Sequence, residues 1–107
     1  NVAIGRDALG AEVAGNKSIA IGAGALENQS FSSSTDSFNV AIGTNAGVDL
    51  TNGEKNVLIG GLAGDELTTG DDNIAIGYQA YGASASSAST GSNNVCGQME
   101  YLFLFSI

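Results

Sequence analysis

Aliphatic residues alternate in short runs along the chain, and a glycine closes each run. This phrase, three aliphatic residues and a glycine, occurs five times: at residues 2–5, 19–22, 40–43, 57–60 and 74–77. The closing glycines are 17, 21, 17 and 17 residues apart. A fixed period of this length predicts a stack of one repeated structural unit, and alternation with period two predicts a strand in each phrase. We therefore expect an all-β fold, a parallel β-solenoid (β-roll or β-helix) of about five coils with a 17-residue repeat.

The first and third positions of the phrase are mostly β-branched, and the middle position is usually alanine. In a strand these two sets project to opposite faces. We expect the third position to form an aliphatic ladder inside the solenoid. This predicted core ladder is Ile4, Ile21, Ile42, Ile59 and Ile76.

Two further columns contain only small residues. The closing glycines are predicted to turn corners with positive φ, which β-branched residues resist. They are Gly5, Gly22, Gly43, Gly60 and Gly77. Three residues later comes an invariant alanine, which limits side-chain bulk at a corner or at a contact with another chain. This packing column is Ala8, Ala25, Ala46, Ala63 and Ala80.

A polar column precedes each phrase. It reads Asn1, Ser18, Asn39, Asn56 and Asn73. Asparagine amides in stacked strands hydrogen-bond to the same residue one rung away. We therefore expect an asparagine ladder along the solenoid.

Two insertions interrupt the period. Residues 30–37 lengthen the second coil by four residues, and residues 83–90 lengthen the fifth. Insertions in solenoids emerge on one side as surface loops, often on the binding side. Phe31, Thr35 and Asp36 are therefore the candidate binding residues. The repeat domain is expected to span residues 1–97, and the apolar segment 98–107 to cap the stack or to begin another module.

Charge and composition exclude several partners. Eleven Asp and Glu against three Lys and Arg give a formal charge of −8, which repels nucleic acid and anionic membranes. No apolar run approaches the length of about 18 residues that a membrane span needs, so we expect no membrane insertion by this segment. One cysteine excludes an intrachain disulfide.

The residues also argue against catalysis and against a cofactor. Histidine is absent, no serine occupies a nucleophile-elbow pattern, and the run 60–64 lacks the Lys-Ser/Thr ending of a phosphate-binding loop. A polysaccharide-acting β-helix enzyme would need carboxylate pairs on rigid strands, whereas these acids occupy variable arms. We predict that the chain is not an enzyme and holds no catalytic residue and no metal.

The carboxylates allow one metal alternative. The pairs at 65–66 and 71–72 flank one arm and could hold Ca²⁺, but the nonapeptide of calcium-binding β-rolls is missing. Solvated surface carboxylates are the favoured interpretation. Lys55 and Asp72 share a column, so we expect a cross-rung ion pair between them.

The phrase, with its preceding asparagine and following alanine, resembles the head repeats of YadA-like trimeric autotransporter adhesins and the repeats of bacteriophage tail fibres. The resemblance covers residues 1 to about 82. It implies a left-handed parallel β-roll, three copies of which pack side by side into a rod used for attachment. Adhesin heads repeat with fewer residues, so the longer spacing favours a virion fibre.

The function hypotheses follow from the repeat and the resemblance. The leading one is a structural or adhesive segment of a phage or virion fibre that presents loops for host-surface attachment. The alternatives are the head of a bacterial trimeric autotransporter adhesin and a subunit of a self-assembling extracellular filament. All place the chain outside the cell or on a virion surface. The expected partners are two further copies in a homotrimer and a host-surface receptor or glycan.

Overall fold

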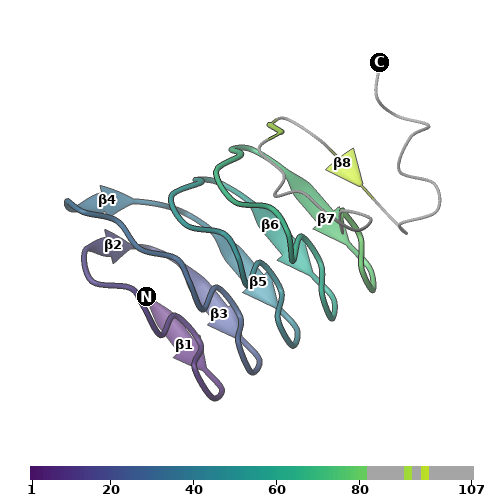
Figure 1. Cartoon of the computed structure of the whole chain (residues 1–107), viewed down its shortest axis with the longest axis horizontal. Helices are drawn as coiled ribbons and strands as arrows, with labels where there is room; N and C mark the ends of the chain where they lie inside the picture. Colours follow the sequence, from purple (N-terminus) through teal and green to yellow (C-terminus); the bar gives the residue numbers. More distant parts are fainter. Residues whose placement is uncertain (82–90, 93–94, 97–107) are drawn as a thin grey trace.

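The chain folds as a solenoid-like stack of parallel strands. A computed structural model describes residues 1–81, 91–92 and 95–96. Over these residues the chain makes about four turns and contains no helix (Figure 1). The all-β solenoid is therefore confirmed, and the count of about five coils stays a prediction. The insertion at 83–90, the segment 98–107 and the end of the domain predicted for 1–97 lie outside the described residues.

One six-stranded parallel sheet contains all five phrases. Its strands, in spatial order, are β1 (Val2–Ile4), β3 (Ile19–Ile21), β5 (Val40–Ile42), β6 (Val57–Ile59), β7 (Ile74–Ile76) and β8 (Val95–Cys96). Each phrase pairs in register with the next, so that Ile4 lies opposite Ile21 and Ile42 lies opposite Ile59. A second, two-stranded parallel sheet pairs β2 (Gly15–Asn16) with β4 (Thr35–Asp36).

Backbone hydrogen bonds continue from coil to coil beyond the strands. In the arm after the phrase, Leu26 N–H donates to the Ala46 carbonyl at 3.0 Å. Tight turns also close within each coil, as in the bond from Ala25 N–H to the Gly22 carbonyl at 3.2 Å. Because the backbone donors and acceptors of the arms are paired in this way, a short repeat forms a regular rung.

The inward face of the strands is the opposite of the predicted one. The middle residues of the phrases from β3 to β7 are fully buried: Ala20, Ala41, Leu58 and Ala75. The predicted core ladder faces outward. Ile4, Ile42 and Ile76 are 59%, 37% and 52% exposed, and Ile21 and Ile59 are half-buried.

The width of the coil explains this reversal. The arm opposite each strand sends its own large side chains inward, among them Leu26 and Leu50, so the strand can contribute only small ones. The exception supports this explanation. Leu58 replaces the alanine in β6, and a Cβ added at Gly47 or Gly64 would lie 2.7 Å from a Leu58 methyl carbon. Close packing against Leu58 leaves no room for a side chain at either glycine.

The alanine packing column lies in the core of the chain itself. Ala25, Ala46, Ala63 and Ala80 are fully buried, and Ala8 packs against the core from the first coil. The column does limit bulk at a corner. It is not available for contact with another chain, so that part of the interpretation was wrong.

The corner glycines adopt the predicted backbone conformation. All five have φ between 125° and 137°. The first four also lie directly against the next corner; a Cβ on Gly22, for example, would be 2.6 Å from the Gly43 carbonyl oxygen. Positive φ and close approach therefore both require glycine here.

Gly60 and Gly61 allow a matched test of this requirement. A methyl group on Gly60 would collide with the Gly77 backbone at a φ of 128°, whereas one on Gly61 would meet only the Tyr78 ring at 3.4 Å. We expect Gly60→Ala to destabilise the chain by more than about 1 kcal/mol and Gly61→Ala by less. Chemical denaturation measures both. Equal effects would remove the conformational argument.

The asparagine ladder is confirmed. Asn56 Nδ2 donates to Asn39 Oδ1 at 3.2 Å, and Asn73 Nδ2 donates to Asn56 Oδ1 at 3.0 Å. The same oxygens accept the backbone N–H of the next asparagine, at 2.9 and 3.0 Å. These three side chains are fully buried, so each rung depends on the adjacent one for its polar partners.

Ser18 interrupts the ladder, and residues from the arms replace the missing amide. Gln29 is fully buried, and its Oε1 accepts a 2.8 Å bond from Asn39 Nδ2. Its Nε2 donates to Glu12 Oε2 at 2.6 Å. Glu12 Oε1 in turn accepts the backbone N–H groups of residues 13, 14, 15 and 31. The contacts that replace the missing amide therefore end on the Glu12 carboxylate.

Stability should depend on the ionisation of Glu12. Burial raises the pKa of Glu12, but the bonds from Gln29 and the backbone outweigh it, so the pKa lies below its ordinary value. A carboxyl group whose pKa is lowered by folding stabilises the folded state at pH values above its ordinary, unfolded pKa. This contribution is lost as the pH falls through the folded-state pKa. We expect Glu12→Gln to lower the melting temperature at pH 7 and this difference to shrink below about pH 4. A difference independent of pH would contradict the assignment.

Candidate functional site

The outer face of the six-stranded sheet carries two columns of aliphatic side chains. The first column is Val2, Ile19, Val40, Val57, Ile74 and Val95, and the second is the displaced Ile ladder. We call these two columns the aliphatic strand face. Val2, Ile19 and Ile74 in the first column are 46%, 37% and 40% exposed.

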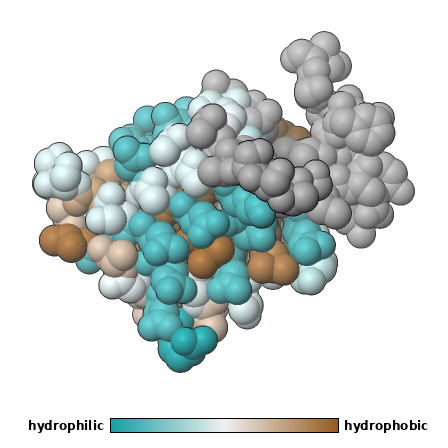
Figure 2. All heavy atoms as spheres, in the orientation of Figure 1, coloured by the Kyte–Doolittle hydropathy of each residue, from teal (hydrophilic) through white to brown (hydrophobic). Residues whose placement is uncertain are grey.

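The regular stacking makes this face continuous along the rod. Successive rungs of a sheet lie about 4.8 Å apart, so side chains in one column touch those of the next rung. Figure 2 shows a face on which hydrophilic residues predominate and hydrophobic ones are scattered. A contiguous apolar patch on a strongly charged chain marks an interaction surface.

The insertion in the second coil is ordered rather than a free surface loop. Thr35 and Asp36 form β4, and Asp36 Oδ2 pairs with Lys17 Nζ at 2.8 Å across the small sheet. Lys17 also lies 5.3 Å from the centre of the Phe38 ring. The Phe31 ring is only 7% exposed and packs over Gly15, so Phe31 anchors the insertion and offers little surface to a ligand.

Beside this insertion lies an open depression of about 350 Å³. Its lining comes from the second and third arms: Ser30, Phe31, Ser32, Ser33, Thr35, Asn52 and Glu54. The structure thus brings Phe31 and Thr35 together there, whereas Asp36 is used in the ion pair. We call this hollow the insertion depression. A smaller one, of about 240 Å³, lies at the other end of the arms and includes Asp7, Glu27 and Asn28.

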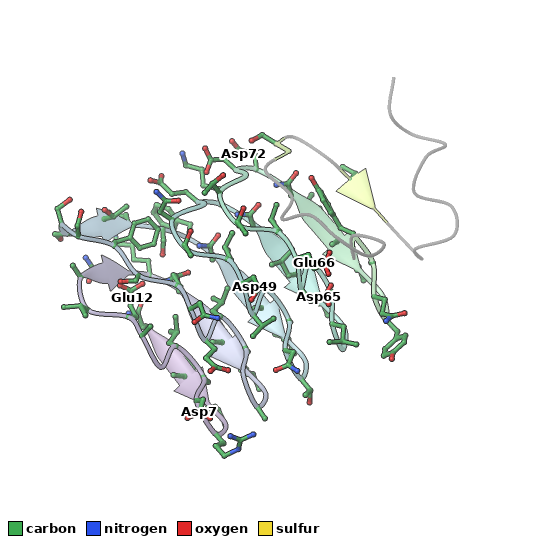
Figure 3. The ribbon with its side chains drawn as sticks, in the orientation of Figure 1. Asp7, Glu12, Asp49, Asp65, Glu66 and Asp72 are labelled. Atoms are coloured by element: carbon green, nitrogen blue, oxygen red, sulfur yellow. The ribbon has the colours of Figure 1, made fainter. Side chains whose placement is uncertain are left out.

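Three of the carboxylates form a loose group on neighbouring arms (Figure 3). Asp49, Asp65 and Glu66 lie near one another on adjacent coils, whereas Asp72 lies on the opposite side of the stack (Figure 3). Burial, then Glu66, then Asp49 raise the pKa of Asp65. Within the described residues, no three His, Cys, Asp or Glu side chains are placed to hold a metal ion. The pairs at 65–66 and 71–72 do not converge.

The predicted Lys55–Asp72 ion pair is also wrong. Lys55 Nζ lies 3.9 Å from Glu54 Oε2 in its own coil. The cross-rung contact at this level instead joins Glu54 N–H to Asp71 Oδ1 at 2.8 Å. Exposed pairs of this kind contribute at most about 1 kcal/mol.

Comparison with known proteins adds no identification. The chain matches no family, no curated protein and no solved structure. No helix long and apolar enough to span a bilayer occurs in the part of the chain that the structure describes.

Two features of these surfaces were not predicted from the sequence. The aliphatic strand face was assigned to the interior. The sequence did contain a contrary signal: Leu58 is the only leucine among the middle-position alanines, and glycines replace larger residues at 47 and 64, which indicates that the middle position points inward. Asn52 and Glu54 were missed because they belong to the coil after the insertion. They lie close to the insertion because the coils stack on one another. Adding one 17-residue repeat to the positions of the insertion could have indicated this.

Proposed function

We propose that this chain is a structural and adhesive fibre segment, a rod that assembles with copies of itself and presents its insertion for attachment. The aliphatic strand face is the observation that carries this proposal. A fibre needs a repeated lateral contact, and this face repeats one apolar contact on every rung.

The occupant that suits this face is a second copy of the chain. A copy carries two aliphatic columns with the same rung spacing, so side chains of parallel copies can interdigitate along the whole stack. The outward residues are Val and Ile, which are stiff and lose little entropy on burial.

Three copies around one axis would cover each strand face with the other two. The threefold number and the left-handed sense come from the resemblance to adhesin heads and tail fibres. The proposed partner set is therefore a homotrimer, now joined through the aliphatic strand face instead of the alanine column. It also includes a host-surface receptor or glycan at the arms.

Within this proposal a phage or virion fibre is favoured over the head of a bacterial trimeric autotransporter adhesin. The longer repeat leaves room for arms that carry an insertion and a depression on the side away from the sheet. Both functions place the segment outside the cell or on a virion surface. Neither requires catalysis or a cofactor, and we propose none.

One observation favours a filament subunit as a second candidate. Successive coils pair in register through parallel strands, so the same pairing between copies would extend the stack. Pairing end to end would give filaments, in contrast to the lateral contact of a trimer.

Immunogold electron microscopy tests the proposal. Antibodies against this segment should label fibres on virus particles, and the adhesin alternative predicts label on fibres at the cell envelope. Label along free filaments would favour the filament subunit. Label confined to the cell interior without any fibre would overturn all three.

A further inference from the structure

The insertion depression has the chemistry of a carbohydrate site. Four of its lining residues carry hydroxyl groups, Asn52 contributes an amide, and Glu54 contributes the only charge. Within the described residues, the hydroxyls of Ser30, Ser32 and Ser33 make no hydrogen bond, so they remain available. We propose that this depression binds a neutral saccharide unit, which would deepen the proposed attachment function and rests on it.

Both walls of the depression are held by the stack. Ser30 N–H donates to the Thr51 carbonyl at 2.9 Å, which joins the second arm to the third. Thr35 belongs to β4, and its Oγ1 donates to the Ser33 carbonyl at 2.9 Å. A site whose walls are already ordered pays less conformational entropy on binding.

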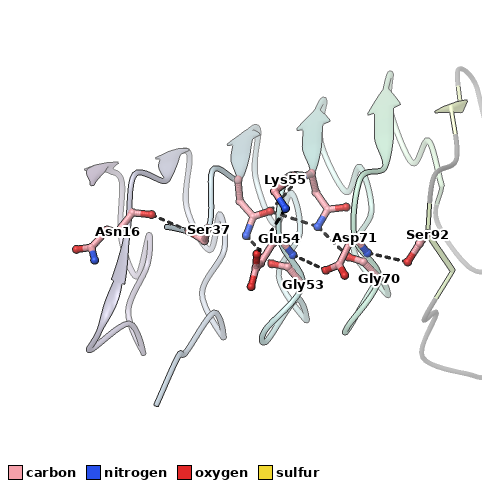
Figure 4. A network of polar contacts seen from close by, with 10 residues as sticks. Asn16, Ser37, Gly53, Glu54, Lys55, Gly70, Asp71 and Ser92 are labelled. Atoms are coloured by element: carbon pink, nitrogen blue, oxygen red, sulfur yellow. Dashed lines mark hydrogen bonds and ion pairs between the residues drawn. The ribbon is translucent and has the colours of Figure 1, made fainter. Parts of the chain in front are cut away.

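The Glu54 wall is also fixed. Its backbone N–H donates to Asp71 Oδ1, and the Asp71 N–H donates to Ser92 Oγ at 2.9 Å (Figure 4). Within the described residues, no backbone N–H group donates to the Glu54 carboxylate, and Lys55 Nζ lies 3.9 Å from its Oε2. A carboxylate in this position accepts hydrogen bonds from sugar hydroxyls.

Charge determines the class of saccharide. No cation lines the depression, and the single lining charge is negative. A sugar that carries phosphate, sulfate or carboxylate would be repelled by Glu54 and by the net charge of −8. Neutral hexoses, whose hydroxyls donate as well as accept, match the lining.

Size and aromatic content limit the affinity. A volume of about 350 Å³ lies at the small end of ligand pockets. The Phe31 ring is almost covered, so no exposed aromatic face is available for stacking. We expect a dissociation constant on the order of 1 mM for a single sugar. Three linked sites in a trimer would raise the avidity for a surface glycan.

Titration of the isotope-labelled protein with methyl glycosides of glucose, galactose and mannose, followed by NMR, tests this site. At least one should shift the amide signals of residues 30–35 and 51–54 selectively. Glucose 6-phosphate should shift them less at equal concentration. Glu54→Gln and Asn52→Ala should each weaken binding about tenfold, the loss expected for one strong hydrogen bond. Glu27→Gln, in the smaller hollow, is the control and should leave the titration unchanged.

The readouts separate this inference from the function on which it rests. The inference is overturned if none of the three glycosides shifts these signals, if the phosphorylated sugar binds more tightly, or if the control variant weakens binding equally. A protein that still assembles as a trimer under any of these results would retain its proposed fibre role.

Discussion

Ala41→Asp is expected to unfold the chain, whereas Ile42→Asp, the adjacent change, leaves it folded. Ala41 is fully buried between the neighbouring strand residues Ala20 and Leu58. A carboxylate there would have no cation and no room. An unpaired buried charge costs about 4 kcal/mol or more, comparable to the whole stability of a small domain.

Ile42 provides the matched control because it lies in the same strand with its side chain on the outer face. It is 37% exposed, so an aspartate there reaches water. Circular dichroism should show the β signal retained for Ile42→Asp and lost for Ala41→Asp. The reverse order would restore the predicted Ile core and refute the inward alanine column.

Asn56→Ala is expected to cause the second largest loss of stability. The Asn56 amide accepts the backbone N–H of Asn73 and donates to the Gly70 carbonyl at 2.9 Å. Its removal takes the Asn56 side chain away from both of these groups. Each such group costs about 1–3 kcal/mol, so the free energy of unfolding should fall by about 2–6 kcal/mol.

Asn52→Ala is the control for this change. Asn52 lies in the same repeat but is exposed, and it has no place in the ladder. Urea denaturation should show little effect of Asn52→Ala, within about 0.5 kcal/mol. Similar midpoints for the two variants would show that the ladder contributes no more than a surface contact.

The repeat made the parallel stack predictable, because period and alternation constrain the backbone directly. The corner glycines and the asparagine ladder were predictable for the same reason: each follows from a residue type with one dominant backbone or hydrogen-bonding property. Ser18 marked the break in the ladder, but its repair by Gln29 and Glu12 depends on which arm positions point inward. The phrase alone does not contain that information.

Hydrophobicity did not predict which face of each strand points into the core. Alternation places Ile42 and Ala41 on opposite faces of the strand, but it does not show which of the two side chains points inward toward the arm. The general preference for burying β-branched residues gave the wrong answer, because the arm already fills a narrow interior with Leu26 and Leu50. The insertion was misread for a similar reason: β4 forms only because β2 lies beside it in the preceding coil.

The mass of the native protein in solution tests the central claim, that the aliphatic strand face joins copies of this chain. Light scattering coupled to size exclusion should give about three times the chain mass of 10.6 kDa, and Ile42→Asp should give the mass of one chain with its β signal retained. A native protein that stays monomeric at micromolar concentration, or a trimer that Ile42→Asp leaves intact, would contradict the account.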